Sequence, residues 1–96
     1  MSTQKIKKLQ KETGYSEMQK LIDNGHAWRM EGHVGRQAMN ALQIGACMLP
    51  TERHTDAYGN TVPSRYDVKP GTTGSYRNCA EFWHNFEYNG YEFTHI

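Results

Sequence analysis

The sequence predicts one small α+β domain that is mainly helical, with a long irregular loop and short strands. Three observations lead to this class. The 96 residues suffice for a single domain. Two segments repeat apolar residues every three or four positions, as helices do. The stretch between these segments holds all three prolines and has no such period. Aliphatic residues are sparse, but a sparse aliphatic content indicates disorder only when the net charge is high, and here it is +1.

The first thirteen residues are predicted to form a flexible basic tail, and residues 14–96 the compact domain. After the initial Met, the tail has apolar side chains only at Ile6 and Leu9, which is too few for a stable isolated helix. A chain of this length buries a modest core, and a homo-oligomer is therefore left open.

A short helix is predicted to follow the tail. Ser16 is its expected N-cap, with Gln19 three residues later as in a capping box. Met18, Leu21 and Ile22 share one helical face. Asp23-Asn24-Gly25 ends the helix, because glycine readily takes a positive φ.

The longest helical pattern lies between residues 27 and 49. Its apolar stripe consists of Ala27, Met30, Val34, Ala38, Ala41, Ile44 and Met48. Gly32 costs about 1 kcal/mol inside a helix relative to Ala, so we expect a helix over 33–44 that ends at Gly45. Trp28 is expected to pack against it, after a strand-like segment over 26–31. One long helix through the glycines is the alternative.

A second clear helix is predicted from Tyr76 to Glu87, capped by Ser75. Its apolar face consists of Tyr76, Cys79, Ala80, Trp83 and Phe86, and we assign Trp83 and Phe86 to the core. Asn89-Gly90 is expected to break the helix. A short strand then follows in which Tyr91, Phe93 and His95 alternate.

The irregular segment over 50–75 is predicted to carry function, because it is long for a structureless connection. Turn residues fill 56–60, and a short edge strand is expected over 61–68 beside Pro63. Tyrosine and arginine commonly anchor protein interfaces. The expected partner-binding residues are Tyr58, Arg65, Tyr66, Asp67 and Lys69, of which Tyr58, Arg65 and Tyr66 are expected to be exposed.

A glycine-rich stretch leads directly into the second helix and could hold an anion, because backbone N–H groups converge at a helix N-terminus. The residues of this candidate site are Lys69, Gly71, Thr72, Thr73, Gly74, Ser75 and Arg77. The stretch lacks the Gly-Lys-Ser/Thr ending of a Walker A loop. An ordinary turn with a capping serine is the simpler interpretation, and phosphate or nucleotide binding is the alternative function.

Other chemistries find weaker support. Cys47, His54, Cys79 and His84 could form a Cys₂His₂ zinc site only with unusual spacing, so no metal and no cofactor is predicted. No Gly-x-Ser-x-Gly elbow or His-Glu-x-x-His motif is present, and the prediction is a protein without catalytic residues.

Nucleic-acid binding is a further, less favoured alternative. Lys5, Lys7, Lys8 and Lys11 make the N-terminus basic, and the helix over 33–44 offers Arg36, Gln37, Asn40 and Gln43 as base-reading side chains. The connection between the first two predicted helices after the tail is too long for a helix-turn-helix.

Several sequence blocks occur together in the central half of the chain. They are Trp28-Arg29-Met30-Glu31-Gly32, Gly35-Arg36-Gln37-Ala38-Met39-Asn40-Ala41-Leu42, Val62-Pro63-Ser64-Arg65-Tyr66-Asp67-Val68 and Lys69-Pro70-Gly71-Thr72. In these blocks the chain resembles short accessory proteins of tailed bacteriophages. The resemblance implies a small phage-encoded accessory protein and no site residues. No apolar run is long enough for a membrane span and no signal peptide is recognised, so we expect the protein in the host cytoplasm, away from membranes. The hypothesis is a protein that binds and modulates a host protein, with inhibition as the expected effect.

Overall fold

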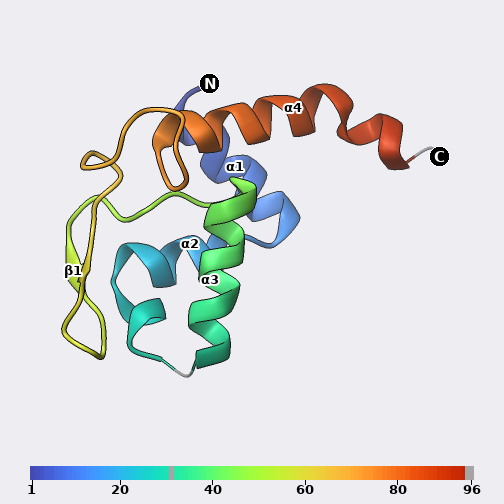
Figure 1. The fold of residues 1–96 in the computed structure, drawn as a ribbon. Coiled ribbons are helices and arrows are strands. Elements are labelled where there is room, and N and C mark those ends of the chain that lie inside the picture. Colours follow the sequence, from blue (N-terminus) through green and yellow to red (C-terminus); the bar gives the residue numbers. More distant parts are fainter. Residues whose placement is uncertain (31, 95–96) are drawn as a thin grey trace.

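The computed structural model describes the backbone of residues 1–30 and 32–94, and the side chains of that range as far as Tyr88 (Figure 1). The elements in chain order are α1 (Thr3–Thr13), α2 (Ser16–Asp23), the 3₁₀ turn η1 (His26–Trp28), α3 (Gly32–Ile44), β1 (His54–Thr55), β2 (Thr61–Val62) and α4 (Tyr76–Thr94). This confirms a small, mainly helical α+β domain.

The N-terminal segment forms a packed helix, so the expectation of a flexible tail over residues 1–13 is wrong. Ile6 and Leu9 of α1 are buried together with Gln10. They pack against α4 and the segment that follows α3. Ser2 caps the helix, because its hydroxyl accepts a hydrogen bond from the N–H of Lys5 at 3.1 Å. Two apolar residues suffice to anchor this helix because both lie on one face and pack against α4 and the segment after α3.

The second helix lies where the sequence predicts it, but its start differs in detail. Ser16 is already inside α2, and the residue before it, Tyr15, makes no side-chain capping bond. The predicted capping role of Ser16 is therefore wrong. Gly25 follows the helix with φ +81°, as expected for its termination.

The main helix α3 agrees with the prediction, beginning at Gly32 and followed by Gly45 with φ +95°. Trp28 packs against the α2–α3 core, as expected. The segment before α3 is not strand-like, because His26–Trp28 forms a 3₁₀ turn. Glu31 lies outside the described residues.

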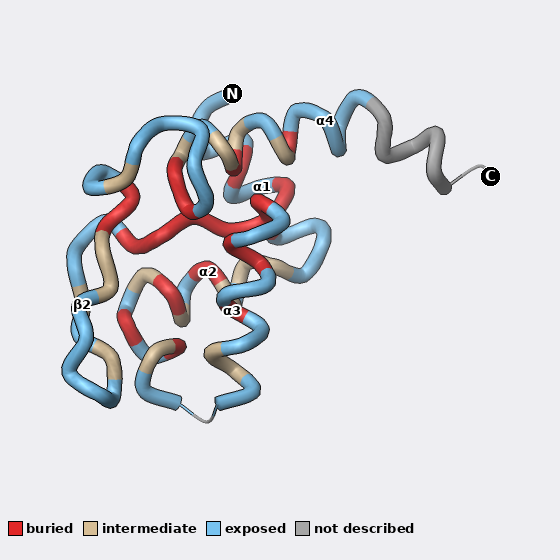
Figure 2. Tube along the Cα trace, in the orientation of Figure 1, coloured by how far each residue is buried: buried red, intermediate tan, exposed pale blue. Residues whose placement is uncertain are grey.

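The centre of the fold is the connection over residues 45–50, which is buried along its whole length (Figure 2). Its side chains alternate between two apolar clusters. Cys47 and Leu49 contact the cluster of α2, η1 and α3, whereas Ala46 and Met48 contact the cluster of α1 and α4. This period of two is typical of extended backbone. The connection thus forms the central layer of the domain.

Buried amide side chains satisfy the polar backbone of this connection. Gln19 Oε1 accepts a bond from the Met48 N–H at 2.8 Å, and Gln19 Nε2 donates to the Met48 carbonyl at 3.0 Å. The Ala46 carbonyl accepts bonds from Gln10 Nε2 at 2.9 Å and from Trp83 Nε1 at 3.1 Å. Backbone groups in an interior must be paired, so these amides replace the hydrogen bonds that a neighbouring strand would provide.

The sheet is a single short hairpin in which His54 pairs with Val62 and Thr55 with Thr61. The predicted edge strand over 61–68 is therefore limited to Thr61–Val62, and Pro63 follows directly. Asp56 shapes the turn, because one carboxylate oxygen accepts hydrogen bonds from the N–H groups of Tyr58 and Asn60. These bonds lower the pKa of Asp56 below its usual value.

The last helix is longer than predicted. Ser75 caps α4 as expected, since its hydroxyl accepts a bond from the N–H of Asn78 at 3.1 Å. However, α4 continues through Asn89-Gly90 to Thr94, so the strand predicted after Gly90 is wrong over 91–94; His95 lies outside the described residues. Trp83 is buried, but Phe86 is 40% exposed and not in the core, because α4 extends beyond the globular part of the domain (Figure 1).

Candidate functional site

Arg65, expected to be exposed, is buried with 9% of its surface accessible. Its Nε donates to the Leu49 carbonyl at 2.8 Å, and its Nη2 donates to Asp23 Oδ1 at 2.9 Å. The Arg65 N–H also donates to the carbonyl of Pro50. The guanidinium therefore links the loop over residues 50–75 to the central connection and to the end of α2.

The carboxylate of Asp67 is also engaged within the loop. It accepts two hydrogen bonds from Arg53, at 2.8 and 2.9 Å, and one each from the N–H and the hydroxyl of Ser64. The Arg53 bonds and the Ser64 N–H hold the pKa of Asp67 far below its usual value. Of the predicted partner-binding set, Tyr58, Tyr66 and Lys69 are exposed, and Asp67 is exposed although its carboxylate is bonded within the loop.

The glycine-rich stretch before α4 uses its own donors. The Gly71 N–H donates to the Ser75 hydroxyl at 3.0 Å, and the Ser75 N–H donates to the Thr72 carbonyl at 3.0 Å. The Thr72 hydroxyl and N–H both donate to the carbonyl of Lys69. These bonds occupy the N–H groups of Gly71, Thr72 and Ser75 within the stretch itself. The turn with a capping serine describes this stretch.

Gly74 shows why this stretch needs glycine. Its φ is +86°, and a Cβ at this position would lie 2.5 Å from Leu49 Cγ. Its carbonyl accepts a bond from the Leu49 N–H at 2.9 Å. The close approach to the central connection is a packing requirement, independent of any ligand.

The four metal candidates do not assemble. Cys47 and Cys79 are buried thiols, and burial raises the pKa of each to about 12. His54 Nε2 lies 2.9 Å from the carbonyl of Asp23, and His84 stacks on Tyr88. Among the described residues, no group of three or more His, Cys, Asp or Glu side chains is placed to hold a metal ion.

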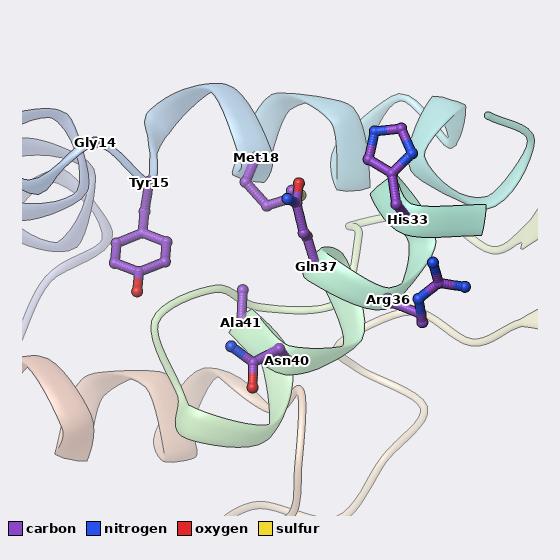
Figure 3. Close-up of a pocket in the computed structure, with 8 residues that line it drawn as sticks. All are labelled: Gly14, Tyr15, Met18, His33, Arg36, Gln37, Asn40 and Ala41. Carbon is purple, nitrogen blue, oxygen red and sulfur yellow. The ribbon is translucent and has the colours of Figure 1, made fainter. Parts of the chain in front are cut away.

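Two grooves border α3, and the first lies between this helix and the start of α2. It has a volume of 570 Å³. His33, Arg36, Gln37 and Asn40 project from α3 along it, while Tyr15 and Met18 come from the facing segment (Figure 3). The lining combines an apolar base with amide and cationic groups.

The second groove lies on the other side of α3, has a volume of 680 Å³, and extends to the hairpin turn. Three large apolar side chains at this groove are strongly exposed: Met30 at 49%, Met39 at 45% and Tyr58 at 91%. The ring of Trp28 also lines the groove, and its buried Nε1 has no hydrogen-bond acceptor within the described part of the chain. We call these four residues the methionine–aromatic groove.

Arg36 and Asn40 line both grooves, because they project from the ridge of α3 between them. With Gln37 and Gln43, they are the exposed polar residues that the nucleic-acid alternative singled out. Lys7, Lys8 and Lys11 are exposed on α1, and Lys5 pairs with Glu87 at 2.8 Å.

The sequence pattern did not place Met30 and Met39 in one groove. Met30 belongs to the predicted apolar stripe, yet it precedes α3, so the helical period does not apply to it. Ile44, at the other end of the stripe, is 43% exposed. Only the position of the hairpin turn beside α3 shows that Met30, Met39 and Tyr58 share one groove.

Comparisons with models of protein families, with curated proteins and with solved structures find no match. Within the described residues, no helix combines the length and apolarity needed to cross a bilayer.

Proposed function

We propose that this protein binds another protein through the methionine–aromatic groove and modulates that partner by covering part of its surface. The observation that carries the proposal is the joint exposure of Met30, Met39 and Tyr58 around one open groove. Large apolar side chains gathered at a groove are typical of an interaction site, whereas scattered ones are not.

The composition of the groove fits recognition of a protein segment. Methionine side chains are flexible and adapt to the shape of an apolar partner. Tyrosine and tryptophan supply large contact areas and are common among residues that dominate binding energy. Arg36 and Asn40 border the apolar part, and a polar border around an apolar centre is the usual anatomy of a protein interface.

The indole of Trp28 supports the same proposal. A buried N–H without an acceptor is costly, and Trp28 Nε1 has no acceptor among the described residues. A backbone carbonyl of a bound segment would satisfy it after a small movement of the groove wall. The resemblance to tailed-phage accessory proteins makes a host cytoplasmic protein the first partner to test, with inhibition as the expected effect.

The test begins with capture from a bacterial lysate, followed by reconstitution of the complex from purified components and titration calorimetry. Met39→Ala and Tyr58→Ala should each weaken binding at least tenfold, the size typical of central interface residues. Tyr66→Ala is the matched control, because Tyr66 is exposed at 74% but does not line the groove. Circular dichroism should show unchanged folding in all three variants.

The control also separates this proposal from recognition by the loop around Tyr66. Loss of binding in Tyr66→Ala with full binding in Met39→Ala would contradict the groove. The phosphate-binding alternative predicts that inorganic phosphate or a nucleotide raises the melting temperature. The nucleic-acid alternative predicts binding that weakens steeply with salt.

A further inference from the structure

A third groove lies along the flank of α4, where Tyr76 and Ala80 are partly buried against the cluster of α1 and α4. Its volume is 660 Å³. It is lined by Tyr76, Ala80 and His84 at intervals of four residues, by Arg77, Glu81 and Asn85 along one border, and by Met1 from the N-terminus. The inward face of the same helix buries Cys79 and Trp83. The groove therefore follows the helix axis and is distinct from the methionine–aromatic groove on α3.

This face continues along the part of α4 that leaves the globule. Tyr88 is 78% exposed, and its ring stacks on His84 with a centroid distance of 6.4 Å. A helix of 19 residues is about 28 Å long, long enough to pair with another helix over several turns. Figure 1 shows the C-terminal part of α4 extending beyond the other elements.

We propose that α4 pairs antiparallel with α4 of a second copy of this chain, and that the two helices cross at Ala80. The small side chain of Ala80 allows close approach at the crossing point, and the rings of Tyr76 and His84 lie on either side of it. The two copies use the same surface, as a twofold symmetric dimer requires.

The charges on this face are arranged to complement themselves. Arg77 and Glu81 lie on the same border of the groove, one before Ala80 and the other just after it. A twofold axis through the crossing point reverses the order of these residues, so that Arg77 of each copy lies beside Glu81 of the other. A parallel twofold pair would instead place the Arg77–Glu81 borders of the two copies on opposite sides of the contact, so these charges would not meet.

The charge complementarity favours a second copy over an unrelated partner. Within one chain, Arg77 and Glu81 form only a long ion pair of 3.4 Å in which both side chains are more than 60% exposed. In the antiparallel pair each guanidinium gains a second carboxylate. The net charge of +1 per chain adds little repulsion between the copies.

Sedimentation velocity with the full chain, from about 10 µM to about 1 mM, tests the dimer. The mass should rise from 11.1 kDa towards twice that value as the concentration increases. Glu81→Arg should weaken association at least tenfold, because it places like charges together at two symmetric positions. The double variant Arg77→Glu/Glu81→Arg should restore association by exchanging the partners.

Two further variants keep the result interpretable. Glu17→Arg makes the same charge change on α2, at a side chain 83% exposed, and should associate as the unaltered chain does. Ala80→Arg should abolish the dimer while circular dichroism confirms the fold. A monomer throughout the concentration range would overturn the proposal. So would a dimer that Glu81→Arg leaves intact, or failure of the double variant to restore it.

Discussion

Replacement of Arg65 by alanine tests whether this residue stabilises the fold or presents a binding surface. The change removes two side-chain hydrogen bonds, to the Leu49 carbonyl at 2.8 Å and to Asp23 Oδ1 at 2.9 Å. The side chain of Arg65 is only 7% exposed, whereas that of Asp23 is 38% exposed. Loss of the Arg65 guanidinium therefore leaves the buried Leu49 carbonyl without this donor and the partly hydrated Asp23 carboxylate without its cation.

The expected loss of stability follows from these contacts. A hydrogen bond to a charged group contributes about 1.5–3 kcal/mol, and removing one partner of a buried pair costs about 3–5 kcal/mol. Asp23 keeps its bond from Gln19 Nε2 and is partly hydrated, so the lower end applies. We expect a loss of about 3 kcal/mol, which lowers the melting temperature by about 12–24 °C in a domain of this size.

Urea denaturation and calorimetry should be carried out on Arg65→Ala, Arg65→Lys and Arg53→Ala. Lysine keeps the charge but not the two directed donors, so Arg65→Lys should retain most of the loss. Arg53 is the matched control, because its ion pair with Asp67 lies on the surface and its side chain is 69% exposed. Its removal should change the melting temperature far less.

A melting temperature of Arg65→Ala within about 4 °C of the unaltered chain, corresponding to about 1 kcal/mol, would refute this reasoning. The guanidinium would then contribute little to the fold and could again be considered for partner binding. A double-mutant cycle of Arg65→Ala with Asp23→Asn isolates the ion pair between these two residues. A coupling energy near zero would attribute the loss of stability to the bond with the Leu49 carbonyl instead.

Three further predictions concern other parts of the fold. Gly74→Ala should destabilise the domain by about 2–4 kcal/mol in urea titrations, because it adds a collision with Leu49 to an unfavourable positive φ. The control Gly59→Ala has φ +84° but open space around the added Cβ, so it should cost only the conformational part. Equal costs for the two variants would contradict the packing argument. Cys47 and Cys79 should react slowly with a thiol reagent at pH 8 and rapidly in urea, since burial raises the pKa of each to about 12; fast reaction in the native state would contradict their burial. The pKa of Asp67 is lowered by Arg53 and Ser64, so the stability that its charge contributes is complete above about pH 4 and declines as the pH falls below that value. In thermal melts, the melting temperature of Asp67→Asn should therefore fall less with acid than that of the unaltered chain. Parallel curves of melting temperature against pH would show that this carboxylate contributes nothing.

The sequence by itself determined the positions of α2, α3 and most of α4. Helical periodicity and end signals act over a few residues, so Gly25, Gly45 and Ser75 mark boundaries without knowledge of the rest of the chain. The same locality explains where prediction failed. Neither the packing of α1 nor the continuation of α4 past Gly90 could be derived from short-range pattern.

Only the tertiary structure decided which polar residues are buried and which apolar ones are exposed. Gln19 bonds to Met48, 29 residues away, and Arg65 bonds to Asp23, 42 residues away. Met30, Met39 and Tyr58 share a groove because the hairpin turn lies beside α3. Burial of a polar group depends on finding a distant partner that compensates its lost hydration, and no local pattern in a chain records that partner.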